Sequence, residues 1–289
     1  MNSIPWWAKI GGKIVLSRLP FGYGLWQGLG LFRHGYMDKL EYVKGVFDRH
    51  VEAAGLTGTL KGKAILEVGP GDSVATALIA ACYGARAVLV DAGAFAVKNA
   101  NVYKNMAQDL ETSGLPVPQA IYQAKSLKDV LATCGAEYLV NGLDSFSKIE
   151  SGSIDFIFSQ AVLEHVRKKE FLDTVRECRR VISPSGIASH RIDLGDHLGG
   201  GLNNLRFSER VWESEFFVKS GFYTNRIQYT EMLSLFRAGG FDCEVQKNSC
   251  WEFLPIRRSL LTRQFQGLSD DELSVRGFDV LLRPTRSAY

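Results

Sequence analysis

The sequence predicts an α/β protein in which a mostly parallel sheet is covered by helices on both faces. Three observations predict this class. Short apolar runs of strand length alternate with helical patterns from about residue 61 to residue 194. The first run, in ILEVGPGDS (65–73), breaks into two closely spaced glycines where a helix should begin. The chain of 289 residues is long enough for one large α/β domain with additions.

Seven strands are expected along the chain. Five apolar runs in the central region are short enough to be buried strands. They are AILEV (64–68), AVLVD (87–91), EYLV (137–140), IDFIFS (154–159) and GIASHRID (186–193), the last preceded by a turn at SPSG (183–186). Near the end of the chain, FDCEVQ (241–246) and FDVLLRP (278–284) are typical of a final pair of strands.

Helical patterns fill the intervals between these strands. The first should span 72–84, with Asp72 or Ser73 near its N-terminal cap and Gly84 after its end. The segment 168–182 has its apolar side chains on one face, which is typical of a helix lying on a sheet. Further helices are expected around Lys98 and Met106, at 126–135, at 210–220 and at 229–240.

The first sixty residues are rich in aromatic side chains and glycine, and only 37–54 has a helical pattern. We interpret 1–60 as a helical lid on a domain spanning 61–289. Within that domain, 61–194 would bind the cofactor, and 195–289 would form an acceptor-side insertion and the C-terminal strands. Two alternatives stay open: the aromatic side chains pack on the main domain, or Trp6, Trp7, Lys9 and Lys13 contact a membrane surface or a lipid-linked substrate.

Composition excludes several classes of function. The net charge is +3 without a run of five basic residues, so no nucleic-acid partner is expected. Five scattered cysteines without a CxxC pair indicate a cytoplasmic, reducing environment, with Cys82 and Cys178 as buried thiols. The longest uncharged stretch, 19–32, is too short and too broken by glycine and proline to span a bilayer.

The glycine turn at 69–71 indicates a nucleotide site, because backbone amides and a helix N-terminus face the ligand. No Gly-Lys-Ser/Thr follows, as a phosphate-binding Walker loop would need. Val74 occupies the position at which a dinucleotide-binding loop has its third small residue. Asp72 would repel a diphosphate, so the turn suits a ligand with a positive charge.

Four segments resemble motifs of class I S-adenosylmethionine-dependent methyltransferases. They are ILEVGPGDS, VLVDAG (88–93), SIDFIFSQAVLEHV (153–166) and SPSGIASHRID (183–193), which occur in the family's order between Lys61 and Asp193. The resemblance implies a Rossmann-like fold with a mostly parallel seven-stranded sheet, and S-adenosylmethionine as cofactor. An NAD-linked oxidoreductase and a non-catalytic Rossmann-like partner subunit are the alternatives from other classes.

The resemblance also implies roles for single residues. Glu67 would hold the ammonium group of the donor or order the loop, beside Asp72. Gly69 and Gly71 would let the backbone approach the ligand, and Asp91 would accept both ribose hydroxyls. The remaining contacts would come from Asn141, Gly142 and Leu143 at the adenine, and from Ser159 and Gln160 at the methionine portion.

Methyl transfer to a hydroxyl group needs a base, for which histidine is suited. Four ionisable residues follow the fifth strand closely: His190, Asp193, Asp196 and His197. We expect His190 or His197, steadied by Asp193 or Asp196, to be the base, with a slight preference for His190. A polar loop capped by these side chains is the alternative, and His165 with Glu164 would be the next candidate.

The segment around His165 resembles a metal-binding pattern of quinone-biosynthesis O-methyltransferases, E-x-x-E-H. Ala161 stands in place of the first acid, so no metal is expected. SHRIDLGDHL (189–198), NNLRFSE and YTNRIQYTEM are similar to methyltransferases associated with bacterial surface-glycan biosynthesis. This similarity favours O-methylation of a sugar or glycan hydroxyl, with Arg206 and Arg226 near a phosphate or sugar. A quinone or phenolic acceptor, favoured by the aromatic N-terminal region, is the alternative.

Overall fold

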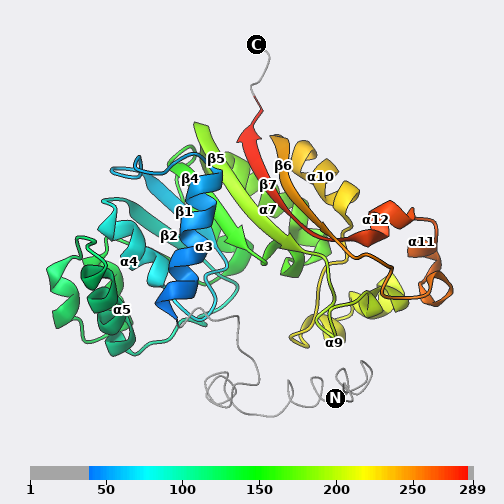
Figure 1. Ribbon diagram of the computed structural model, residues 1–289, viewed down its shortest axis with the longest axis horizontal. Coiled ribbons are helices and arrows are strands. Elements are labelled where there is room, and N and C mark those ends of the chain that lie inside the picture. Colours follow the sequence, from blue (N-terminus) through cyan, green and yellow to red (C-terminus); the bar gives the residue numbers. More distant parts are fainter. Residues whose placement is uncertain (1–38, 286–289) are drawn as a thin grey trace.

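The structure, a computed structural model, describes residues 39–285. Seven strands form one sheet in the order β3-β2-β1-β4-β5-β7-β6 (Figure 1). The strands are β1 (Ala64–Val68), β2 (Arg86–Val90), β3 (Glu137–Leu139), β4 (Ile154–Gln160), β5 (Ile182–Asp193), β6 (Phe241–Cys250) and β7 (Val275–Pro284). Strands β1 to β5 are parallel to one another, and β7 is antiparallel to β5 and β6. The predicted fold class, a Rossmann-like mostly parallel sheet, is confirmed.

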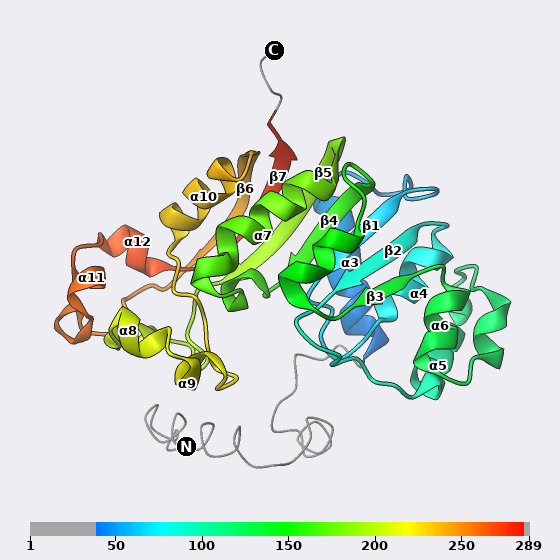
Figure 2. The same cartoon turned by 180° about the vertical axis from the view of Figure 1, so that it is seen from behind.

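Each face of the sheet packs against its own layer of helices. One layer contains α3 (Leu40–Ala53), α4 (Ala75–Cys82), α5 (Ala100–Thr112) and α6 (Leu127–Thr133). The other contains the 3-10 helix η2 (Gly142–Lys148), α7 (Lys168–Val181) and α10 (Tyr229–Ala238), which lie in front of the sheet in Figure 2. Along β1, Ile65 packs in the first layer and Leu66 in the second, as the alternation of side chains in a strand requires.

Helix α3 belongs to the core. Val43, Val46 and Phe47 are each 1% exposed and pack in the same cluster as α4. The predicted helix 37–54 is therefore confirmed over its described part. Residues 1–38, with the tryptophans and the lysines of the proposed membrane contact, lie outside the described residues, so the interpretation of 1–60 as a lid stays a prediction.

Two expected elements differ from the structure. The turn expected at 183–186 is part of β5, whose pairing with β4 shifts register between Ile154 and Phe156. Ile154 pairs with Ile182 and Phe156 with Ile187, so β5 absorbs the polar segment as an irregularity rather than ending. The single helix expected at 210–220 is two short helices, α8 (Glu209–Trp212) and α9 (Glu215–Val218).

The segments after β5 and β6 form a satellite layer beside the end of the sheet, with α9 at the lower edge of Figure 1. It contains η4 (Asn203–Arg206), η5 (Arg258–Leu260), α11 (Arg263–Gln266) and α12 (Asp270–Ser274). Two small apolar clusters hold it together, one around Leu205 and Phe265 and one around Trp212. The Arg226 guanidinium joins them, lying 5.4 Å from the Trp212 ring centroid and 5.3 Å from that of Phe265.

Within residues 39–285, no helix is long and apolar enough to cross a membrane. Cys82 and Cys178 are buried free thiols, as predicted. Burial raises the pKa of each thiol, to about 11 for Cys82 and to about 12 for Cys178. Both are therefore protonated at neutral pH and act as small apolar side chains.

Candidate active site

The loop after β1 passes close to the segment after β4. Gly69 has φ +76°, and a Cβ built on it would lie 2.4 Å from Cγ1 of Val162. A side chain cannot fit there without displacing Val162, and the backbone conformation itself favours glycine. The N–H of Gly69 donates to the carbonyl oxygen of Val90 at 2.8 Å. The glycine turn is thus fixed between the carboxyl ends of β2 and β4.

Asp91 ties together the ends of three strands. Its Oδ2 accepts from the N–H of Gly71 at 2.9 Å, and its Oδ1 accepts from Ala92 at 2.7 Å. Its backbone oxygen accepts from Gly142 at 2.8 Å. The structure therefore brings Gly69, Gly71, Asp91 and Gly142 to one place, the carboxyl edge of the sheet, where α/β proteins bind nucleotides.

Glu67 lies beneath this loop, with its side chain fully buried. Burial raises the pKa of its carboxyl group to about 8, and Oε2 has no hydrogen-bond partner in residues 39–285. Asp72, at the far end of the loop, is 4% exposed. A buried carboxyl group of this kind favours a cationic ligand group nearby, because the cation offsets the cost of its ionisation.

Ser159 and Gln160, the last residues of β4, face opposite sides of the sheet. Oγ of Ser159 lies 2.8 Å from Nδ1 of His190 on the α7 side. Oε1 of Gln160 lies 3.2 Å from Nε2 of His50 on the α3 side. Of these two residues, Gln160 is the more exposed at the carboxyl edge, since Ser159 is 0% exposed.

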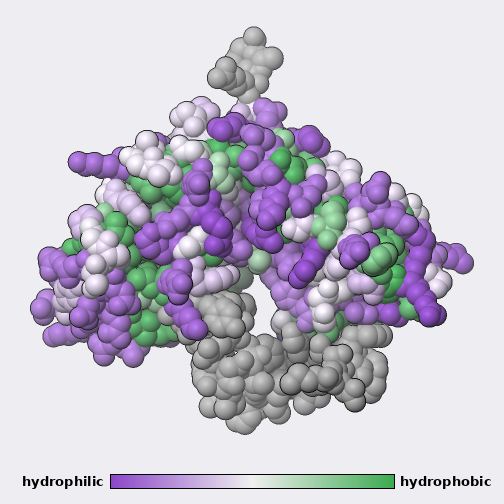
Figure 3. All heavy atoms as spheres, viewed as in Figure 1, coloured by the Kyte–Doolittle hydropathy of each residue, from purple (hydrophilic) through white to green (hydrophobic). Residues whose placement is uncertain are grey.

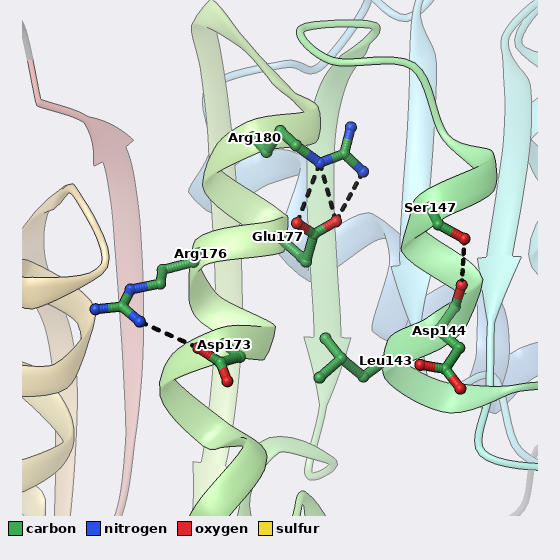
Figure 4. Close-up of a pocket in the computed structure, with 7 residues that line it drawn as sticks. All are labelled: Leu143, Asp144, Ser147, Asp173, Arg176, Glu177 and Arg180. Atoms are coloured by element: carbon green, nitrogen blue, oxygen red, sulfur yellow. Dashed lines mark hydrogen bonds and ion pairs between the residues drawn. The ribbon is translucent and has the colours of Figure 1, made fainter.

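The residues after β3 are partly exposed to solvent. Asn141 is exposed, and its N–H donates to Oγ of Ser145. Leu143 lines a groove of about 620 Å³ between η2 and α7, and its side chain points toward α7 in Figure 4. The charged groups of this groove are largely paired on α7 itself, Arg176 with Asp173 and Arg180 with Glu177.

His190 lies inside the core. Its ring is 2% exposed and stacks on Phe236 of α10 at 6.1 Å between centroids. Burial lowers the pKa of His190 to about 3, so the neutral ring is a weak base. The structure separates this imidazole from Asp193, which β5 places on the opposite face.

The two aspartates expected to steady the base hold the loop after β5. Oδ1 of Asp193 accepts from the N–H of Gly195 at 2.8 Å. The buried carboxylate of Asp196 accepts from the backbone N–H groups of Leu198, Gly201 and Asn203. Within residues 39–285, neither carboxylate has a histidine among its hydrogen-bond partners. This arrangement matches the alternative of a polar loop capped by its own side chains.

His165 and His197 meet at the carboxyl edge. Both are exposed, and their rings lie edge to face, with centroids 4.7 Å apart and planes at 87°. Nδ1 of His165 lies 2.8 Å from the backbone oxygen of Tyr223. Because a carbonyl oxygen can only accept, Nδ1 must carry the proton, and the lone pair of the neutral ring is then on Nε2. The Tyr223 carbonyl group thus fixes the tautomer of His165.

The turn that presents His165 is held from both sides. Ala161 has φ +52°, a strained conformation for a non-glycine residue, and turns the chain out of β4. Asn225 donates from Nδ2 to the carbonyl oxygens of Leu163 and Val166, at 2.9 and 3.0 Å. The N–H of Asn225 donates to the carbonyl oxygen of Glu164 at 2.7 Å. The sequence offered no signal for Asn225, because its partners are distant backbone atoms.

Glu164 points inward, away from His165. Its carboxyl group is buried, and burial raises its pKa to about 8. Oε1 accepts from the N–H of Asp193 at 3.3 Å, and Oε2 has no hydrogen-bond partner in residues 39–285. Within the same residues, no group of three or more His, Cys, Asp and Glu side chains could hold a metal ion.

The position of Arg226 differs from the expectation that it lies near a phosphate or sugar of the acceptor. Its side chain is buried, and its guanidinium donates to the carbonyl oxygen of Phe207 at 2.6 Å and to Glu209. It therefore organises the satellite layer and does not face a phosphate or sugar. Arg206 is half-buried and donates from Nε to Asn203 at 3.1 Å.

Residues 66–189 match a family model described as a methyltransferase domain. No curated protein is similar enough in sequence to match the chain. Several solved structures are similar to this chain at low sequence identity. Phosphoethanolamine N-methyltransferase 2 of Haemonchus contortus is 14% identical, with a TM-score of 0.43 over 78% of this chain and 49% of that chain, so this chain spans about half its length.

Two further solved structures are similar in the same way. An arsenic(III) S-adenosylmethionine methyltransferase of Chlamydomonas reinhardtii is 16% identical, with a TM-score of 0.45 over 79% of this chain and 65% of that chain. A protein of Pyrococcus horikoshii is 11% identical, with a TM-score of 0.46 over 92% of this chain and 100% of that chain. The matched domain spans β1 to Ser189 in β5, the same strands whose ends form the candidate site.

Proposed function

We propose that this chain is a class I S-adenosylmethionine-dependent methyltransferase that methylates a hydroxyl group of a sugar or glycan. The methyltransferase domain matched by residues 66–189 and the order of the seven strands support this proposal. S-adenosylmethionine is the cofactor. The antiparallel β7 between β5 and β6 departs from the 3-2-1-4-5-6 strand order of dinucleotide-binding folds, which disfavours the NAD-linked alternative.

One observation supports O-methylation most. His165, with its basic Nε2 fixed by the Tyr223 carbonyl group, lies three residues after Val162, which touches the glycine loop at Gly69. The candidate base and the candidate donor loop are therefore neighbours at the same edge. Figure 3 shows the described surface hollowed at this edge, between the part that contains α4 and the part that contains α9.

The chain's own residues would act by alignment and by proton transfer. When bound, S-adenosylmethionine supplies the methyl group, which passes to the acceptor oxygen as its bond to sulfur breaks. Nε2 of His165 would take the hydroxyl proton, and the products would be a methyl ether and S-adenosylhomocysteine. Holding the two reactants in line can provide roughly 7–11 kcal/mol of the barrier, and a placed base a further factor of about 10²–10⁴.

The donor would be held by the residues around the glycine loop. Glu67 and Asp72 would face its ammonium group, and the Asp91 carboxylate would accept from the ribose hydroxyls. Gly69 and Gly71 would allow close approach of the backbone. The remaining contacts would be Asn141, Gly142 and Leu143 at the adenine, and Ser159 and Gln160 at the methionine portion.

Of the two candidate acceptors, a glycan and a quinone or phenol, the polar side chains at the carboxyl edge of the sheet support the glycan. His197, which lies beside His165, and Arg206, which follows β5 in η4, offer donors and charge that match sugar hydroxyl and phosphate groups. A quinone or phenol is the alternative acceptor. The aromatic residues that favour it lie outside the described residues.

A panel assay with methyl-labelled donor tests the proposal. We expect transfer to sugar nucleotides or lipid-linked sugars, and transfer only to quinols or phenols would establish the alternative. His165→Ala should lower turnover by about 10²–10⁴ while S-adenosylhomocysteine binds as before in calorimetry. His197→Ala is the matched comparison, because it removes the ring that packs against His165 and leaves the Tyr223 contact. Full turnover by His165→Ala would mean that another group is the base.

A further inference from the structure

The geometry points to His50 as a positioning residue, which fixes the amide group of Gln160 so that its N–H donors face the carboxylate of the methyl donor. The inference rests on the proposed placement of the donor at the carboxyl edge of the sheet. His50 lies on α3, outside the matched methyltransferase domain and more than a hundred residues from Gln160.

His50 is held between α3 and the two strands at the centre of the sheet. Its ring is 7% exposed and packs against Phe158, with centroids 5.3 Å apart. Nδ1 lies 2.8 Å from Oγ of Ser189 on β5, and Nε2 lies 3.2 Å from Oε1 of Gln160 on β4. Both ring nitrogens are therefore within hydrogen-bond distance of a side chain.

The partners determine which nitrogen holds the proton. Oε1 of Gln160 can only accept, so Nε2 of His50 donates to it. Nδ1 then accepts in the neutral ring, and the hydroxyl group of Ser189 donates to it. Burial lowers the pKa of His50 to about 4, so this neutral arrangement persists at neutral pH.

The hydrogen bond to His50 also determines where the amide nitrogen of Gln160 points. With Oε1 committed to His50, Nε2 of Gln160 and its two N–H donors point away from α3, and this nitrogen has no hydrogen bond within residues 39–285. Gln160 is also the last residue of β4, directly before the strained Ala161 and two residues before Val162 at the glycine loop. A pair of N–H donors at this point suits a carboxylate, whose oxygens only accept.

A purely structural role would not need a histidine at position 50. Packing α3 on the sheet requires an apolar side chain, and a buried imidazole costs free energy unless both nitrogens are paired. Ser189 alone would satisfy one of them. Using a half-exposed strand-end amide as the second partner orders a group that otherwise would rotate freely.

Calorimetric titration of the full chain with two ligands tests the inference. S-adenosylhomocysteine contains the amino-acid portion with its carboxylate, whereas 5′-methylthioadenosine lacks it. We expect Gln160→Leu and His50→Phe each to weaken S-adenosylhomocysteine by about tenfold, which equals about 1.4 kcal/mol of binding free energy. The double variant should bind no more weakly than Gln160→Leu, because His50 acts through Gln160.

His50→Gln, whose amide N–H can replace that of Nε2, should restore most of the affinity. Ser189→Ala is the matched control, because it removes the other hydrogen bond of His50 and leaves the one to Gln160. Affinity for 5′-methylthioadenosine should stay unchanged in every variant.

Equal weakening of both ligands, or additive losses in the double variant, would overturn the inference and leave His50 a packing residue. If His50→Phe does not fold, unchanged affinity in Gln160→Leu overturns the inference equally. Failure of the unmodified chain to bind S-adenosylhomocysteine would instead contradict the proposed function, so the two failures are distinguishable.

Discussion

At the scale of single residues, the carboxylate of Asp91 has two roles, and a single substitution can test them. Its carboxylate orders Gly71 and Ala92 and is expected to accept from the ribose. Asp91→Ala should therefore weaken S-adenosylhomocysteine by about 1–3 kcal/mol, the cost of leaving hydrogen-bonding groups unpaired. Isothermal titration measures this directly.

The control for this substitution is Asp173→Ala, which removes an exposed carboxylate from α7. It should leave donor affinity unchanged. Circular dichroism should show that both variants are folded. Donor affinity equal to that of the unmodified chain in a folded Asp91→Ala would contradict the role of Asp91.

The sequence indicated where the residues around the glycine loop meet, but it did not indicate that the ring of His190 is buried, and the reason is physical. Gly69, Gly71 and Asp91 follow strands whose parallel order fixes their meeting point. The alternation of side chains along β5 predicted which face of the sheet His190 lies on. It did not predict which helices cover that face. Both faces of this sheet are covered by helices, so α7 and α10 bury the ring that was the preferred base.

At the scale of elements, the turn η3 (Leu163–His165) depends on a single side chain of another segment. The Asn225 side chain donates to the carbonyl oxygens of Leu163 and Val166, and the Asn225 backbone N–H donates to that of Glu164. Asn225→Leu removes one hydrogen bond from the Leu163 carbonyl group and leaves that of Val166 without its side-chain donor, so we expect a loss of about 1–3 kcal/mol in the free energy of unfolding.

Urea unfolding measures this loss, and turnover should fall further than stability alone explains, because His165 is released. Asn101→Leu on the exposed side of α5 is the matched control and should change stability by less than about 0.5 kcal/mol. A stable Asn225→Leu variant with full turnover would show that η3 holds its shape unaided.

The sequence predicted strands and helices correctly where the pattern of buried side chains along the element is regular. Strands β1 and β2 are short apolar runs because helices cover both of their faces. The polar segment 183–186 misled because proline, serine and glycine are typical of turns, whereas pairing with β4 holds it in β5. Helices α8 and α9 are short because their support comes from Trp212 and the satellite clusters rather than from their own periodicity.

At the scale of the whole molecule, buried ionisable groups predict how stability depends on pH. The pKa of Glu67 rises from 4.5 in the unfolded chain to about 8, and that of Glu164 does the same. Between these values the folded chain keeps protons that the unfolded chain has lost. The free energy of unfolding therefore falls as pH rises, by up to about 1.4 kcal/mol per pH unit for each group.

Glu67→Gln removes one of these groups, so the fall with pH should be shallower in this variant. Urea unfolding of the chain without donor between about pH 6.5 and 8.5 measures the slope. Glu244→Gln, an exposed site on β6, is the control and should leave the slope unchanged. Equal slopes in Glu67→Gln and the unmodified chain would show that Glu67 is ionised in the folded state.

The position of β7 has a consequence for synthesis. β7 is the last described strand along the chain, yet it lies between β5 and β6. A chain emerging from the ribosome therefore holds β5 as an unpaired edge, with β6 lacking its partner, until residues 275–284 have been made. Such an edge is a template for pairing with other chains. The interval between translating β5 and β7 is thus the period in which a nascent chain most needs chaperone protection.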